Sequence, residues 1–214
     1  MTAEVSSSTA ENPLSIASLE SLDQMTEEEF VQWCDEDVRA EYVDGKVIIM
    51  TPESTRDERA RWSIGGVLRD FVEYHDLGEV FGPNLQIRLR PRLRRIPDLL
   101  FISKAQLHLL QEAHFEGAPD LAMEIVSPDS QERDKQDKYQ EYEAFGIREY
   151  WIIAPLTRQI DVYHLTDQGK YELLLPESGV YHSRAIPGFF LNPQWLWGDP
   201  RPKKLDILRE LGLL

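Results

Sequence analysis

The chain has a single cysteine, Cys34, among its 214 residues. One cysteine excludes an internal disulfide and a zinc site built from several cysteines. The five histidines, at positions 75, 108, 114, 164 and 182, show no H-x-H or H-x-x-x-H spacing. Because zinc sites draw on such closely spaced ligands, zinc chemistry is not expected.

Long hydrophobic runs are also lacking. No apolar stretch approaches the roughly 18 residues of a membrane span. The first residues, "MTAEVSSSTAENP", have neither a basic start nor an apolar segment, so we expect a cytoplasmic protein. Residues 1–17 are rich in Ser, Thr, Ala and Glu and predict a disordered N-terminal tail.

Positive charge is scarce, with 23 Lys and Arg against 38 Asp and Glu and a net charge of -15. Phosphate binding depends on clustered Lys and Arg, so the balance argues against a broad nonspecific coat for nucleic acid. One segment differs, because "RLRPRLRR" carries five arginines in eight residues. Such a run can contact phosphates, or it can be a solvated strand edge that prevents aggregation. Its arginines are Arg88, Arg90, Arg92, Arg94 and Arg95.

A hydrophobic fraction of 42% and a charged fraction of 29% are typical of a globular protein. No repeat or low-complexity linker divides the chain. We therefore expect one domain over residues 18–200, followed by a C-terminal helix over residues 201–214, where "KKLDILRELGLL" has an amphipathic pattern.

The sequence pattern in the first half of this domain predicts a short helix, then a hairpin, then a long helix. Thr26 and Glu29 form a capping-box pattern that opens a short helix ending near residue 35. Asp44-Gly45 stands between two β-rich arms and predicts a hairpin. Apolar residues at helical intervals over 54–75 predict a long helix, in which a Gly-Gly pair at 65–66 either weakens the helix or allows close packing.

The second half is rich in strands. "EVFGPNLQIRL", "RIPDLLFIS" and "LAMEIVS" predict strands, and so do "REYWIIAP", "QIDVYHL" and "KYELLL". Between these groups, Ser127 and Pro128 favour a helix start and Gly146 favours its end. The whole order predicts an α/β (α+β) fold with a central sheet flanked by helices.

An acid interrupts one of the predicted apolar strands. Glu124 shares a strand face with Ala122 and Val126, whereas Met123 and Ile125 face the other side. An ionised carboxylate in such a setting costs several kcal/mol unless it is paired, hydrogen-bonded or bound to a cation. Glu124 therefore needs a partner.

Asp98, in "IPDLLF", is a second acid in an apolar predicted strand and needs a partner for the same reason. Two acids on neighbouring strands could share Mg²⁺ or Mn²⁺, which prefer oxygen ligands, although an arginine partner is the commoner solution. Asp134, Lys138 and Tyr142 follow at intervals of four, so this helix stripe could carry the lysine back over the acids. The alternative for Lys138 is an ordinary pair with Asp134, contributing about 0.2–0.5 kcal/mol.

Together these features resemble the PD-(D/E)XK nuclease motif, and the wider string resembles the Uma2 family of restriction-endonuclease-like proteins, a domain of unknown function in cyanobacteria. The resemblance covers roughly residues 26–197. It rests on "EYVDGKV", "PDLLFI", "PDLAMEIVSPDS", "DKQDKYQEYEAFGIREYWIIAP", "VYHL" and "IPGFFL". It implies a restriction-endonuclease-like mixed β-sheet flanked by helices, and a metal-dependent DNA endonuclease that hydrolyses phosphodiester bonds.

The chain departs from the nuclease pattern at Val126, where the motif places its lysine. The resemblance suggests that the lysine has moved to the helix, which makes Lys138 the candidate. In "TPESTRDERA", where relatives often carry a histidine, this chain has Asp57 and Glu58.

The implied site uses Asp98, Glu124 and the backbone carbonyl of Ile125 to hold Mg²⁺ or Mn²⁺. Lys138 orients the attacking water or stabilises charge on phosphorus. Glu41 is either a further acid of the site or a solvated hairpin acid. The arginine run would contact flanking phosphates, and a homodimer is expected only by analogy with the fold.

The alternative is a noncatalytic domain that binds nucleic acid or protein. An open cleft in which the Lys138 ammonium approaches both carboxylates would favour hydrolysis. A Lys138 side chain that points to bulk solvent would favour the binding role. Buried ion pairs that exclude solvent would remove the support for hydrolysis and leave only the fold.

Overall fold

A computed structural model of the chain describes residues 24–34, 38–50, 52–126 and 134–214. The predicted tail over residues 1–17 and the predicted helix start at Ser127 and Pro128 lie outside the described residues. None of the described helices is both long enough and apolar enough to cross a membrane.

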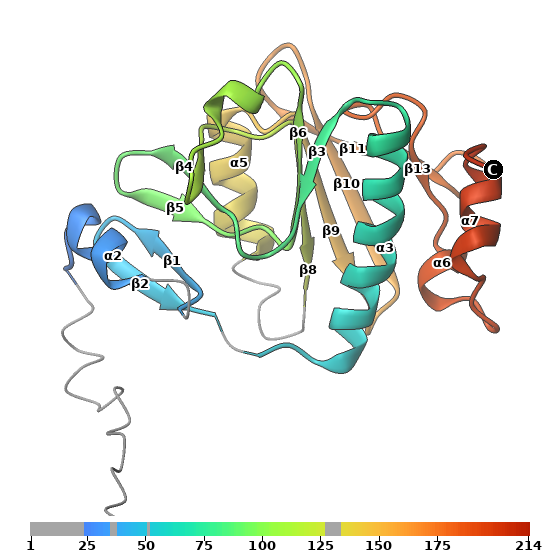
Figure 1. Ribbon diagram of the computed structural model, residues 1–214, viewed down its shortest axis with the longest axis horizontal. Coiled ribbons are helices and arrows are strands. Elements are labelled where there is room, and N and C mark those ends of the chain that lie inside the picture. The colour runs from blue at the N-terminus through green and yellow to red at the C-terminus, as the bar shows by residue number, and fades with distance from the viewer. Residues whose placement is uncertain (1–23, 35–37, 51, 127–133) are drawn as a thin grey trace, which may run out of the picture.

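A six-stranded mixed sheet lies at the centre, in the order β11-β10-β9-β8-β6-β3 (Figure 1). The predicted central sheet is therefore confirmed. Strands β8 and β9 are parallel because α5 connects them, whereas every other neighbouring pair in this sheet is antiparallel. Its strands are β3 (Gly78–Phe81), β6 (Leu99–Ser103), β8 (Leu121–Ile125), β9 (Glu149–Ala154), β10 (Gln159–Leu165) and β11 (Tyr171–Leu174).

Helices cover both faces of this sheet. On one side lie α3 (Thr55–Tyr74), α6 (Gln194–Trp197) and α7 (Lys204–Glu210). On the other lies α5 (Tyr139–Phe145), which continues a π-helical turn over Asp134–Lys138 (Figure 1).

Strand β8 contributes side chains to the hydrophobic core on each face of the sheet, as the alternation of its side chains predicts. Met123 and Ile125 pack with α3, whereas Ala122 and Val126 pack on the α5 side. A strand buried on both faces reads as a continuous apolar run, and Glu124 interrupts that run on the α5 side.

A second, five-stranded sheet has the order β2-β1-β5-β4-β7. Its strands are β1 (Ala40–Val43), β2 (Lys46–Ile49), β4 (Gln86–Arg90), β5 (Leu93–Arg95) and β7 (His114–Glu116). Helix α2 (Glu27–Trp33) packs against β1 through Phe30 and Tyr42, whose rings stack at 5.0 Å between centroids. Ile87 and Phe115 extend from this sheet into the core on the α5 side. A short pair, β12 (Tyr181–His182) and β13 (Phe190–Leu191), and a 3₁₀ turn at Leu107–Leu109 complete the described elements.

The local signals for caps and turns are present. Thr26 and Glu29 form both contacts of the capping box. Asp44 and Gly45 have φ values of 51° and 103°, the left-handed geometry of a two-residue hairpin turn. Gly146 ends α5 with a φ of 86°.

Of the two adjacent glycines inside α3, Gly65 serves close packing. A Cβ atom on Gly65 would lie 2.9 Å from Leu99 Cδ2, so the missing side chain lets α3 approach β6 closely. A Cβ atom on Gly66 would meet nothing nearer than Lys204 Nζ, at 3.7 Å. This approach also brings Arg61, one turn earlier on α3, against Asp98, the residue just before β6.

The two glycines should therefore respond differently to alanine. Gly66→Ala should raise the free energy of unfolding by about 0.5–1 kcal/mol, because alanine favours a helix interior and the site has room. Gly65→Ala should lose this gain or destabilise the protein, since Leu99 must move. Urea denaturation of both variants gives the comparison, and equal stabilisation by the two would contradict the close contact.

Candidate active site

The two strand acids lie side by side. Strands β6 and β8 are antiparallel with Leu99 opposite Met123, so Asp98 stands opposite Glu124 one step beyond that pair. Asp98 Oδ2 accepts a hydrogen bond of 2.7 Å from the N–H of Ile125. Because the N–H and C=O of one strand residue point to the same side, the Ile125 carbonyl also faces the Asp98 edge.

Lys138, in the π-helical turn before α5, contacts Glu124. Lys138 Nζ lies 2.8 Å from Glu124 Oε1 and 2.9 Å from Glu41 Oε1. One turn later, the Tyr142 hydroxyl donates to the same Glu124 oxygen at 3.0 Å. Residues 138 and 142 thus lie along one stripe as the spacing indicates, whereas the side chain of Asp134 is outside the described part of the chain.

Glu41 is a buried member of this cluster, not a solvated hairpin acid. Its Oε2 accepts from Arg95 Nη1 at 2.8 Å, and its Oε1 accepts from the Ile96 N–H at 3.1 Å. Burial acts to raise the pKa of Glu41, but Lys138, Arg95 and the Ile96 N–H outweigh it and hold that pKa at about 2. Glu41 therefore keeps its negative charge and holds the lysine in place.

Arg61 is a member that the sequence reasoning missed. Its Nη1 donates to Asp98 Oδ1 at 3.1 Å and also binds Glu53, and its Nη2 binds Glu58. Arg61 lies three residues before the buried Ile64, so its place on the apolar stripe of α3 was a usable signal. No pattern in the sequence marked Glu53.

These groups are closed off from solvent. The exposed fractions are 6% for Asp98, 3% for Glu124 and 0% for Lys138. Burial, reinforced by the charge of Glu53, raises the pKa of Asp98 to about 6, against the opposing effects of the Ile125 N–H, Lys138 and Arg61. The lysine and Glu124 converge as predicted, but they do so in buried ion pairs and not in an open cleft.

The oxygen donors nonetheless suit a hard cation. Mg²⁺ is commonly held by one or two protein carboxylates, with water and substrate phosphate completing its shell. Asp98 and Glu124 supply two such groups, and Glu53 Oε2 is buried without a hydrogen-bond partner among the described residues. No set of three or more His, Cys, Asp or Glu side chains in the described ranges is arranged to hold a metal by itself. The residues thus fit a magnesium ion shared with substrate, not a metal enclosed by protein.

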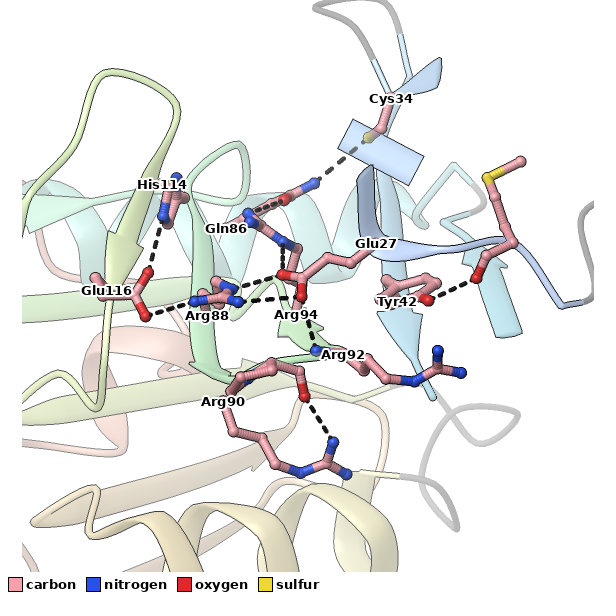
Figure 2. A network of polar contacts seen from close by, with 12 residues as sticks. Glu27, Cys34, Tyr42, Gln86, Arg88, Arg90, Arg92, Arg94, His114 and Glu116 are labelled. Carbon is pink, nitrogen blue, oxygen red and sulfur yellow. Dashed lines mark hydrogen bonds and ion pairs between the residues drawn. The ribbon is translucent and has the colours of Figure 1, made fainter. Parts of the chain in front are cut away.

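The arginine run is largely neutralised by acids. Glu27 on α2 binds Arg88 at 2.5 Å and Arg94 at 2.8 Å, and it also accepts from the Arg92 backbone N–H (Figure 2). Burial raises the pKa of Glu27, yet its bonds with these arginines lower that pKa to about 2.

The rest of the run is bound in the same way. Arg90 pairs with Asp44, and Arg95 pairs with Glu41 and Glu141. Of the five arginines, Arg92 alone is exposed as a residue. Contact between these five arginines and DNA stays a prediction, and phosphate would have to compete with carboxylates for four of them.

Comparison with known proteins gives two findings. A family model described as "Uma2: Putative restriction endonuclease" matches residues 27–194. The fold is also similar to the crystal structure of a putative nuclease belonging to DUF820 from Anabaena variabilis, with a TM-score of 0.66 and 19% sequence identity. That similarity covers 80% of this chain and 97% of the other. No curated protein matches the chain.

The buried lysine should be a major source of stability. Lys138→Met should lower the free energy of unfolding by about 3–5 kcal/mol, because it leaves Glu41 and Glu124 buried without their shared cation. Lys170→Met is the matched control. Lys170 is exposed and pairs with Glu143 at the surface, so its loss should change the free energy of unfolding little. Similar denaturation curves for the two variants would contradict the role of Lys138.

Asp98 should titrate near pH 6 in EDTA-treated protein. Its pKa is raised from 3.8 on folding, so the unfolded chain ionises first and stability falls as pH rises from about 4 to 6. Carbon-13 NMR of aspartate carboxyls, with Asp98→Asn for assignment, measures the pKa directly. A midpoint near 4 would show that burial and Glu53 do not govern this group.

Proposed function

The chain belongs to the Uma2 family, described as putative restriction endonucleases, and on that premise we propose that it is a metal-dependent nuclease that hydrolyses phosphodiester bonds in DNA. The observation that carries this proposal is the convergence of Asp98, Glu124 and Lys138. Two hard oxygen donors and one ammonium are the groups needed to offset the repulsion between an anionic substrate and attacking hydroxide. A homodimer, with one site for each DNA strand, belongs to the same proposal.

In this mechanism Asp98 and Glu124 hold Mg²⁺ or Mn²⁺, with the backbone carbonyl of Ile125 as a third donor. The bound metal supplies polarisation of a phosphoryl oxygen and a lower pKa for its bound water. The role of the two acids is to position the metal. The acids are themselves oriented by hydrogen bonds, Asp98 by the Ile125 N–H and Glu124 by the Tyr142 hydroxyl.

Lys138 contributes its charge. Its ammonium lies against Glu124, so in the mechanism it orients the attacking water or stabilises the negative charge that develops on phosphorus. Glu41 is a positioning residue, because it accepts from the ammonium at 2.9 Å and is itself anchored by Arg95.

The burial of these ion pairs favours a second candidate, a noncatalytic domain that binds nucleic acid or protein. Asp98 already has Arg61 as a partner, and Glu124 has Lys138. If these pairs do not rearrange when substrate and metal bind, the carboxylates serve the fold and not a reaction.

Cleavage of supercoiled plasmid with Mg²⁺ or Mn²⁺ tests the two candidates. Asp98→Asn and Glu124→Gln should each lower the cleavage rate by at least about 100-fold, since each removes a metal ligand. Asp76→Asn, which alters an exposed acid paired with Lys104, should cleave like the unaltered protein. Circular dichroism checks that each variant is folded.

Metal binding gives a readout that does not depend on turnover. Calorimetry should detect Mg²⁺ binding to the unaltered protein with DNA, and weaker binding to both ligand variants. Equal cleavage by all the proteins would identify a contaminating nuclease. An unaltered protein that binds DNA but never cleaves it would establish the second candidate instead.

A further inference from the structure

A cleft of about 1070 Å³ runs along α3, between this helix, residues 80–84 and residues 201–207. Arg61 and Leu99 lie in its wall. Leu99 directly follows Asp98, and Arg61 donates to the Asp98 carboxylate. The cleft therefore borders two neighbours of Asp98 on the α3 side of the sheet, although Asp98 itself does not line it. Lys138 contacts the acid cluster from the α5 side.

The cleft is basic in an acidic protein. Its wall holds three acids, Glu58, Asp70 and Glu73, against five basic residues, although the chain has a net charge of -15. The basic residues are Arg59, Arg61, Arg69, Arg201 and Lys204.

Three of these arginines are available to a ligand. Arg59, Arg69 and Arg201 are exposed, and within the described part of the chain none has a carboxylate at ion-pair distance. The arginines at 88, 90, 94 and 95 all have such partners. Among the described residues, the cleft thus holds three arginines without a carboxylate partner, whereas the arginine-rich run holds one, Arg92.

An exposed tryptophan stands beside these charges. Trp62 is 72% exposed, and its indole Nε1 donates to Glu58 Oε1 at 2.7 Å. This bond engages the edge of the ring and leaves its faces available for stacking. Glu58 in turn binds Arg61, which donates to Asp98. A continuous chain of polar contacts thus joins the aromatic ring to the acid cluster.

The spacing along α3 places these groups on one side of the helix. Arg59, Trp62, Gly66 and Arg69 follow one another at intervals of three and four residues. Gly66 has no side chain, so the helix surface between the ring and Arg69 is open. Aromatic faces that stack on bases, flanked by cations that follow the backbone, are the means by which proteins bind single strands.

We propose that this cleft binds an unpaired DNA strand, with a base stacked on Trp62 and the flanking phosphates held by Arg59, Arg69 and Arg201. The proposal deepens the proposed function and rests on it, because it names the form of substrate and its route to the acids. An unpaired strand is required because a base inside a duplex has no free face for the indole ring. Arg61, which lines the cleft and donates to Asp98, would meet the strand at the part of the wall nearest that acid.

Binding of a fluorescein-labelled single-stranded oligonucleotide, followed by anisotropy in EDTA to prevent cleavage, tests the cleft. Trp62→Ala should weaken binding by about 10-fold or more. The double variant Arg59→Ala/Arg69→Ala should weaken it and lower the slope of log affinity against log salt by about 0.7 for each lost phosphate contact. Arg158→Ala, which alters an exposed arginine between β9 and β10 that does not line the cleft, is the matched control and should bind like the unaltered protein. Arg90→Ala tests the arginine run in the same assay.

Fluorescence gives a second signature. Single-stranded DNA should quench part of the tryptophan emission of the unaltered protein. Trp62→Phe should keep most of the affinity and lose that quenching, because phenylalanine still stacks. Arg59, Trp62 and Arg69 are exposed side chains of α3, and melting curves check that the variants fold.

The outcomes separate the two proposals. If the unaltered protein binds and cleaves DNA while the cleft variants match it, the cleft proposal is overturned and the nuclease proposal stands. Loss of binding in Arg90→Ala instead would assign the strand to the arginine run. Tighter binding of the matching duplex, unaffected by Trp62→Ala, would exclude stacking of an unpaired base. No binding and no cleavage by the unaltered protein would overturn both proposals.

Discussion

The ion pair of Lys138 with Glu41 and Glu124 joins three parts of the molecule. Glu41 belongs to the five-stranded sheet, Glu124 to the central sheet, and Lys138 to the turn that leads into α5. Each of these charges is buried, so each would cost several kcal/mol without the others. The fold around the candidate site therefore depends on their mutual neutralisation, and the same requirement keeps the proposed catalytic groups within contact distance of one another.

Much of the positive charge of this acidic protein is used internally. Glu27 gathers Arg88 and Arg94, and Glu41 and Glu141 hold Arg95. These pairs attach α2 and α5 to the five-stranded sheet and lower the positive potential that a run of arginines would otherwise present. Where the net charge is strongly negative, a substrate anion is attracted only by cations that have no internal partner. That is why the location of unpaired arginines matters more than their density in the sequence.

Helix α3 connects the interior with the surface. One side of it packs on β6, where Gly65 permits close approach to Leu99. Arg61 extends from this buried side to Asp98, and Trp62 is exposed on the adjacent side. Glu58 contacts both residues, so a change at the surface of the helix is coupled to the geometry of the acid cluster.

The sequence by itself determined the elements and the need for partners. Caps, turn residues and periodicity predicted the helices at Thr26 and Ser54, the hairpin at Asp44 and the end of α5 at Gly146, because these signals act over a few residues. It also showed that Glu124 required a partner, since the alternation of strand faces places this acid in an otherwise apolar run. Only the tertiary structure decided which basic side chain pairs with each acid. Arg61 lies 37 residues from Asp98, and Glu27 lies 61 residues from Arg88. A charge attracts any opposite charge, so attraction alone does not select a partner. The packing of the layers determines which pairs are buried and desolvated together, and it therefore determines the partners.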